Sequence, residues 1–533
     1  MTAAVTARRE VGAGLGSMVR LVGRRDRIGI AAWIALAVSL PLASAAALPA
    51  LVPTEGEQVA FATELARDPL TTALLGPVYG TSIEALIAMR SGMQSVFAVG
   101  IGSLVLVLRH TRAAEQDGHA ELLDAAPVGR HVRLAAALLV TAVANLAIAA
   151  LTVVTLVSLF GHPLAGSAVL ALSAAGFGLV TAAVAAVAAQ IAQTVTGART
   201  IGFGLLAAAF AVRLVGDVAG VDALSWASPV GWVRLTRAFT GDQWWVLALF
   251  PAAAAALTVL AVRLAGGRDL GAGLLPARPG PAEGAPRLST AVGLFVQLRL
   301  PGLIATTVAV GAACVGIGYA SSTLDGLLDD SPMITSRLAP LAGSTLGEAF
   351  VAICLYLAGL GVACYVVATV LTLRRDETGR QAELLLATPT SRGSWIAGPL
   401  LIALIAPVVL LSVAGLAAAA GFTAGSARTD RFGAQMGAAM AQVPVNWIVA
   451  GGVVVLVGYL PRIAVAVAWG ALAAAVIDLG LWELEVLPRP LYDPFSYTHP
   501  AVDYGPGTLV AMSLIGVGLI ALGAHRVQRR DLG

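Results

Sequence analysis

The sequence predicts an all-α polytopic membrane protein with about twelve transmembrane helices, arranged as two tandem six-helix repeats. Hydrophobic residues make up 58% of the 533 residues, and charged residues make up 12%. That charged share is about half of what soluble proteins carry. Apolar runs of about 20 residues recur along the chain, each long enough to cross a bilayer as a helix. Residues of the first half also recur in the second half at a nearly constant spacing, which indicates an internal duplication.

Twelve apolar stretches are the candidate transmembrane helices. With both termini in the cytoplasm, the short inner loops hold most of the 33 arginines, as the positive-inside rule requires. We therefore expect a multi-pass membrane protein with both termini in the cytoplasm, and the family resemblance given below implies the bacterial cell (inner) membrane. A signal peptide is the competing interpretation of the first stretch, but residues 1–27 before it are longer than a typical n-region. The stretches lie at 28–50, 88–108, 134–160, 165–192, 199–220, 245–265, 301–321, 349–373, 396–421, 445–460, 463–483 and 507–524.

The internal repeat is visible in three separated regions of the chain. An even number of spans lies between the matched residues, so the two halves have the same orientation and are related by an axis along the membrane normal. An offset of 262 relates Glu115 to Glu377. Offsets of 264 and 265 relate four further pairs, which are Thr81 with Thr345, Glu84 with Glu348, Pro229 with Pro494 and Trp232 with Tyr497.

The predicted domain organisation has four parts. Residues 1–27 contain an amphipathic connecting helix, in which apolar side chains and arginines suit the headgroup boundary. Residues 28–265 form the first six-span half, and residues 266–287 form a cytoplasmic linker rich in proline and glycine. Residues 288–533 form the second half, which is predicted to begin with its own connecting helix.

A polar segment follows the second span at 109–130, and a copy of it follows the eighth span at 374–392. Both copies contain the pattern E-x5-E-L-L-x3-P-x2-R, which predicts a short cytoplasmic helix with a leucine pair on a charged element. Exposed apolar side chains commonly mark an interaction site, so we expect these leucines to bind in a groove on a partner protein. The alternative is a helix at the headgroup boundary, but acidic side chains suit an anionic membrane surface poorly. The residues predicted to dock a partner are Glu115, Glu121, Leu122, Leu123, Pro127, Arg130, Glu377, Glu383, Leu384, Leu385, Pro389 and Arg392.

Ionisable residues are rare inside the predicted spans, which singles out Arg213, Asp217 and Asp478. Arg213 and Asp217 are four residues apart and can pair on one helix face. Two interpretations stay open, a structural ion pair near the interface and the outer mouth of a transport path. Trp232 and Tyr497 each follow a proline just outside a span, where aromatic residues commonly line the membrane interface.

Several kinds of chemistry are excluded by composition. All 33 basic residues are arginine, so the chain has neither the lysine of a P-loop nor the amine of a Schiff base. Cys314, Cys354 and Cys364 lie in apolar runs without C-x-x-C spacing, which favours neither a zinc cluster nor a disulfide framework. The formal net charge of +3 is too small to indicate nucleic acid. We predict no catalytic residue, cofactor or metal ligand in this chain.

The paired polar segments, the six-plus-six layout and the length resemble the ABC-2-type transporter permeases of the polyketide-antibiotic (tetronasin-type) exporter family from actinobacteria. The resemblance extends over essentially the whole chain. It implies export of amphipathic or apolar compounds, driven by two copies of a separate ATP-binding cassette subunit that bind ATP and Mg. It also implies that the polar segments are coupling helices docked on that ATPase, and that the regions of Trp232 and Tyr497 form an outer gate.

Two other function classes stay open on the sequence alone. A twelve-span ion-coupled secondary transporter would share the two-half plan, but such proteins generally use acids near mid-membrane, and these spans offer almost none. An integral membrane enzyme acting on lipid would need a cluster of acids or histidines at the boundary. The six histidines are scattered, so the sequence favours the ATP-driven permease.

Overall fold

A computed structural model of the chain describes residues 14–67, 72, 75–116, 129, 131–269, 271–275, 284, 286–327, 346–483, 495, 498–499 and 505–530. Within these ranges, eleven helices are long and apolar enough to cross a membrane. The prediction of an all-α polytopic membrane protein is therefore confirmed. The predicted span at 463–483 is helix α23 (Ala464–Glu483), whose side chains are described only as far as Ala475.

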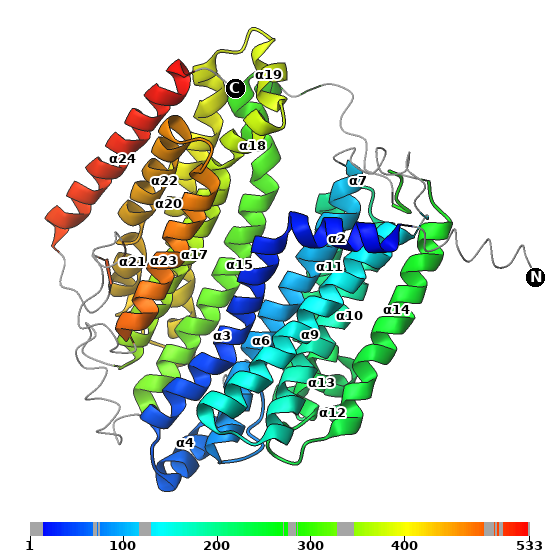
Figure 1. The fold of residues 1–533 in the computed structure, drawn as a ribbon. Coiled ribbons are helices and arrows are strands. Elements are labelled where there is room, and N and C mark those ends of the chain that lie inside the picture. The colour runs from blue at the N-terminus through cyan, green and yellow to red at the C-terminus, as the bar shows by residue number, and fades with distance from the viewer. Residues whose placement is uncertain are drawn as a thin grey trace, which may run out of the picture. The chain divides into compact units, whose positions relative to one another are not determined.

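The chain divides into two compact units, Met1–Gly280 and Pro281–Gly533. The boundary between them falls inside 266–287, the stretch predicted as the linker. Each unit is built from its own set of long helices (Figure 1).

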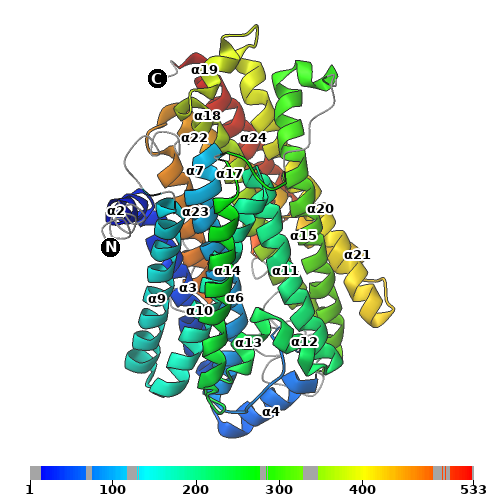
Figure 2. The ribbon, with the colours of Figure 1, turned by 90° about the vertical axis from the view of Figure 1, so that its right-hand side faces the viewer.

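The long helices of the first unit follow the predicted spans. Short helices lie at the two ends of these long helices (Figures 1 and 2). One end carries α2 (Leu15–Arg25), and we call it the α2 end. The other carries α4 (Glu55–Arg67), α12 (Asp222–Ala227) and α13 (Pro229–Leu235), and we call it the α4 end. The long helices are α3 (Arg27–Leu51), α6 (Ile83–Leu108), α9 (Val132–Phe160), α10 (Leu164–Ile191), α11 (Val195–Ala219) and α14 (Leu249–Gly266).

Helix α10 forms the centre of the first unit, because small residues let its neighbours approach closely. It packs against α6, α9 and α14. A Cβ atom at Gly176 would lie 2.8 Å from Phe250 of α14, and one at Gly178 would lie 2.6 Å from Val99 of α6. Lipid provides no hydrophobic drive for helices to associate, so such close packing is what holds membrane helices together.

Helix α2 lies in the N-terminal stretch that was predicted to contain an amphipathic helix. Its apolar residues Met18 and Val22 are buried against Leu106 and Val132, whereas Arg20 and Arg24 are exposed. The helix ends at Asp26, where the chain turns into α3.

The second unit contains a hairpin of short helices and a set of long ones. The short helices α18 (Thr372–Thr378) and α19 (Gln381–Leu386) follow α17 (Leu346–Val370). The predicted tenth span at 445–460 is α22 (Val443–Tyr459), and the shorter α21 (Phe432–Met440) precedes it. The remaining helices are α15 (Ala291–Leu327), α20 (Arg392–Ser426), α23 and α24 (Pro506–Arg529).

The start of the second unit differs from the prediction of a connecting helix separate from the span. A short 3-10 turn, η3 (Pro286–Ser289), leads into α15, which runs unbroken for 37 residues from Ala291. The Thr290 hydroxyl accepts a hydrogen bond from the Gly293 amide and so caps the start of this helix. Pro301 lies inside the helix without ending it, as membrane helices commonly tolerate.

Helices α15 and α20 pack backbone to backbone. A Cβ atom at Gly318 would collide with the carbonyl oxygen of Ala418, and one at Gly421 would collide with the carbonyl oxygen of Val315. Gly316, two residues from Gly318 on the same helix, has no atom within 4 Å of the position of a Cβ. Contact between the two helices therefore depends on Gly318 and Gly421.

This packing predicts a different outcome for two neighbouring substitutions. Gly318→Val forces α15 away from α20 and should lower the free energy of unfolding by about 2 kcal/mol or more, the usual cost of overpacking a core. Gly316→Val meets open space and should change it by less than about 0.5 kcal/mol. Unfolding of the purified protein in mixed micelles, followed by circular dichroism, compares the two. Equal destabilisation would contradict the packing described here.

Candidate functional site

The structure describes only the first part of the segment at 109–130. Helix α6 continues through a π-helical turn, η1 (Arg109–Ala113), into α7 (Ala114–Gln116). π-Helical turns are rare and often lie at functional sites. Of the predicted docking residues in this copy, Glu115 is described, and the others lie outside the described residues, namely Glu121, Leu122, Leu123, Pro127 and Arg130.

Glu115 is buried between arginines. Its side chain is 9% exposed, and its carboxylate accepts hydrogen bonds from Arg112 Nη1 at 2.8 Å and from Arg268 Nη2 at 2.8 Å. A second bond from Arg268 Nη1, at 3.1 Å, makes the contact bidentate. Bidentate pairs between arginine and carboxylate are among the strongest in proteins, so the carboxylate is fixed in place.

The same arginines bind the end of α10. Arg112 Nε donates to the carbonyl oxygen of Ala189 at 2.9 Å, and Arg268 Nε donates to Gln190 Oε1 at 2.7 Å. Both arginines also donate to the carbonyl oxygen of Ala272. The last carbonyl groups of a helix lack partners within the helix, and cations are favourable there. The cluster therefore joins the extension of α6 to the ends of α10 and α14.

The second unit contains the equivalent cluster. Glu377, at the end of α18, is 5% exposed and accepts a hydrogen bond from Arg374 Nη1 at 3.0 Å. Arg530, just beyond α24, donates to the other oxygen of the same carboxylate. We call Arg112, Glu115 and Arg268 the first clamp, and Arg374, Glu377 and Arg530 the second clamp.

The two clamps are copies of each other in sequence as well as in geometry. In each, the glutamate and the distant arginine are 153 residues apart. Sequence reasoning matched the two glutamates but missed Arg268 and Arg530. The missed signal is the tetrapeptide R-D-L-G, which occurs at 268–271 and again at 530–533. The duplication therefore includes an ion-pair cluster and not only a helix pattern.

The rest of the second segment is described and lies on α19 and the turn after it. Arg380 has a left-handed backbone with φ 57° and begins α19. Leu384 is 73% exposed and Glu383 is also exposed, whereas Leu385 packs on the core of the unit. Pro389 lies in the exposed turn after α19. A single leucine of the predicted pair is thus free to meet a partner.

Arg392, the last predicted docking residue, contacts its own unit. Its Nη1 donates to the carbonyl oxygen of Arg530 at 2.7 Å and to that of Gln528 at 3.2 Å. The second segment is therefore attached to the end of α24 at both Glu377 and Arg392. Glu115, Glu377 and Arg392 hold the segments in place, and the exposed residues of α19 form the outward surface of the second segment.

At the α4 end of the first unit, Asp217 holds two arginines. Arg213 Nε lies 2.5 Å and Arg234 Nη1 lies 2.6 Å from Asp217 Oδ2. The Ser225 hydroxyl donates to the other oxygen, Oδ1, at 2.8 Å. The predicted pairing of Arg213 with Asp217 is confirmed, and Arg234 of α13 is a third member that the sequence did not single out. The cluster fastens α12 and α13 to α11.

The other residues predicted for an outer path or gate are described in part. The Trp232 indole donates to the carbonyl oxygen of Trp226 at 2.6 Å, and its ring packs edge-on against Phe250. Asp478 lies on α23, but its side chain is outside the described residues, as is Tyr497. Within the described residues, no group of three or more His, Cys, Asp or Glu side chains could hold a metal ion.

Comparison with known proteins gives the family. A family model described as the C-terminal domain of the multidrug efflux system permease Rv1217c matches residues 288–527. The multidrug efflux system permease protein Rv1217c of Mycobacterium tuberculosis (strain ATCC 25618 / H37Rv) is 36% identical to this chain over 529 residues, covering 97% of the chain and 95% of the relative. The likeness therefore extends through both units, and the chain belongs to the Rv1217c family of multidrug efflux system permeases.

Proposed function

We propose that this chain is the membrane-spanning subunit of an ABC exporter that moves amphipathic or apolar drug-like compounds out of the cell. Two copies of a separate ATP-binding cassette subunit supply ATP hydrolysis and bind Mg. Polyketide antibiotics of the tetronasin type are one class of cargo that fits the proposal. The α2 end of the first unit and the α19 end of the second face the cytoplasm. The name of the relative and the absence of lysine, which removes the P-loop route to ATP, support this assignment.

The observation that carries the proposal is the duplicated clamp. A permease without its own ATPase needs a stiff connection between the surface that meets the ATPase and the helices that cross the membrane. In the first unit, the clamp joins the extension of α6 to α10 and to the end of α14. In the second unit, Glu377 and Arg392 join the segment of α18 and α19 to the end of α24.

Because the charged groups of the clamp are buried, this connection is difficult to break. Removing one partner from a buried charged pair costs about 3–5 kcal/mol, because the remaining charge is left without compensation. The clamp therefore resists being pulled apart, and a force on α19 moves α24 with it. Leu384, exposed on α19, provides apolar contact for a groove on the ATPase.

The docking surface leads to a first test of the proposal. Leu384→Ser removes an exposed side chain that makes no contribution to the core, so the permease should fold normally. Its co-purification with the tagged ATPase subunit should fall by about tenfold, the effect of losing a contact that buries one leucine. Leu159→Ser is the control, since Leu159 is 69% exposed and lies at the end of α9, in the α4 end of the first unit. Undiminished co-purification of Leu384→Ser would remove α19 from the docking surface.

The clamp leads to a second test. Arg530→Gln leaves Glu377 with Arg374 alone and should lower the efflux obtained for each ATP hydrolysed by about tenfold, a typical size for coupling between sites. Co-purification of the ATPase should be retained, because the docking surface is unchanged. ATP hydrolysis and efflux are measured together in vesicles that contain the complex.

A charge exchange is the control for this second test. Glu377→Arg with Arg530→Glu restores the same three charges at the same end of the unit, so coupling should recover in part. Recovery would assign the loss to the ion pair rather than to altered folding. Full coupling in Arg530→Gln would contradict the role of the clamp, and proton-driven efflux by the chain without an ATPase would support the secondary transporter instead.

A further inference from the structure

Exposed arginines gather at the α2 end of the first unit. Arg20, Arg24 and Arg25 belong to α2, and Arg27 is the first residue of α3. We call these four the α2 arginines. All four are exposed, and none of them pairs with a carboxylate among the residues that the structure describes. Positive charge that a protein leaves unpaired on its surface attracts an anionic partner.

The acid nearest to the α2 arginines in sequence is already engaged. Asp26, between α2 and α3, is 5% exposed. Its carboxylate oxygens lie 2.9 Å from Arg109 Nη2 and 2.5 Å from His110 Nε2, both on the π-helical turn η1. This contact fixes the junction of α2 and α3 to the extension of α6. It also leaves the α2 arginines without the negative charge of Asp26.

Helix α2 lies against the side of the long helices. Met18 and Val22 are buried in one apolar cluster with Leu106 of α6 and Val140 of α9. Val140 lies eight residues after the start of α9, which is roughly 12 Å along that helix. Figures 1 and 2 show α2 crossing the long helices beside α9. Its outward face therefore points away from the bundle at the level where α3 begins to span, which is the level of lipid headgroups.

The outward face of α2 carries both charge and apolar surface. Arg20 and Arg24 are one helical turn apart on the same face, so both guanidinium groups can reach one phosphate. Leu21, between them in sequence, is 47% exposed, and Ile28 at the start of α3 is 76% exposed. Arginine side chains beside apolar surface suit the boundary between headgroups and acyl chains.

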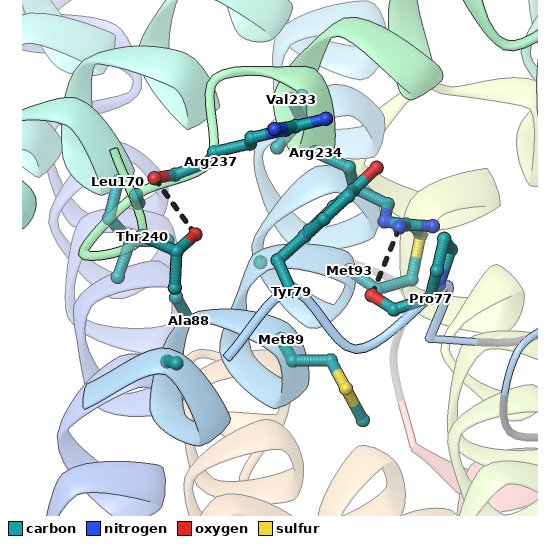
Figure 3. Close-up of a pocket in the computed structure, with 13 residues that line it drawn as sticks. Pro77, Tyr79, Ala88, Met89, Met93, Leu170, Val233, Arg234, Arg237 and Thr240 are labelled. Atoms are coloured by element: carbon teal, nitrogen blue, oxygen red, sulfur yellow. Dashed lines mark hydrogen bonds between the residues drawn. The ribbon is translucent and has the colours of Figure 1, made fainter. Parts of the chain in front are cut away.

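Arginines at the α4 end of the same unit are engaged by the protein itself. Arg234 Nη1 lies 2.6 Å from Asp217 Oδ2, and its Nη2 donates to the carbonyl oxygen of Pro77 at 3.4 Å (Figure 3). Arg237 lies 5.0 Å from the centre of the Tyr79 ring. Within the described part of the chain, the α2 arginines have no comparable contact with another element. The basic charge at the α2 end is therefore available to a partner.

We propose that the α2 arginines form a binding surface for anionic phospholipids of the leaflet at the α2 end. The guanidinium groups bind the phosphates, and Leu21 and Ile28 contact the acyl chains near the headgroups. Each arginine close to an anionic lipid surface raises affinity roughly fivefold. The surface goes beyond the proposed function, because lipid binding needs neither ATP nor the ATPase.

The test is native mass spectrometry of the purified full-length permease in an uncharged detergent. Dioleoyl phosphatidylglycerol is the anionic probe, and dioleoyl phosphatidylcholine is the uncharged comparison. Arg20→Gln with Arg24→Gln should weaken binding of the anionic probe by about thirtyfold, the effect of two lost arginines, and leave the uncharged probe unchanged. Because both side chains are exposed, the variant should fold normally.

The matched control removes two arginines at the other end of the unit. Arg67 of α4 and Arg90 of α6 are both exposed, and Arg67→Gln with Arg90→Gln lowers the net charge by the same amount. This pair should change the affinity for the anionic probe by less than about twofold, because distant exposed charges are screened. An equal loss in the control pair would overturn the proposal, since the effect would then follow net charge alone.

A conservative pair distinguishes a lipid surface from a protein contact. Arg20→Lys with Arg24→Lys keeps both charges, so affinity for the anionic probe should stay within about threefold of the wild type. A loss as large as that of the glutamine pair would overturn the proposal, because it would indicate a contact that needs the arginine fork. Unchanged lipid affinity in the glutamine pair, with loss of the co-purified ATPase, would overturn it as well and assign α2 to the ATPase.

Discussion

In each unit, a buried glutamate between two arginines joins the polar segment to the membrane helices. The rest of the arrangement depends on this contact. Glu115 and Glu377 each bind one arginine three residues earlier and a second arginine 153 residues later in the chain. The first arginine belongs to the same segment, whereas the second lies just beyond the last helix of the unit. The carboxylate therefore closes a loop of the chain, and this loop contains every membrane span between the glutamate and the distant arginine.

In the proposed exporter, this arrangement lets the polar segments transmit force to the membrane helices. Charges buried in this way are expensive to separate, so the cluster behaves as one rigid element. In the first unit the arginines also bind the end of α10, the most buried helix of that unit, through Ala189 and Gln190. A protein that docks on such a segment acts on the centre of the unit and not only on a surface helix. In the proposed exporter, outward residues such as Leu384, which is exposed, are the ones that contact the ATPase.

Much of the fold could be predicted from the sequence, because lipid restricts a spanning chain to helices of a certain length. The hydropathy pattern located α3, α6 and α9 and the amphipathic α2. The hydropathy pattern did not reveal that α15 includes the residues of the expected connecting helix. The start of a helix depends on local capping, which Thr290 provides here.

The site was harder to predict than the fold. The pattern E-x5-E-L-L-x3-P-x2-R presented both glutamates of each copy as surface residues, whereas Glu115 and Glu377 are buried among arginines from distant parts of the chain. Only contacts between residues far apart in sequence decide this, and single-sequence patterns do not contain them. The contact of Arg234 was not predicted for the same reason, since Arg234 lies on α13 and its partner Asp217 lies on α11.

The most direct test is to measure the distance between α19 and α24 during transport. Spin labels at Gln381→Cys and His525→Cys, in a protein whose Cys314, Cys354 and Cys364 are replaced by Ser, report that distance by double electron–electron resonance. If the clamp is rigid, α19 and α24 move together, and one narrow distance distribution should be observed that is the same with and without ATP. A shift or splitting of this distribution on ATP binding, with efflux intact, would contradict it.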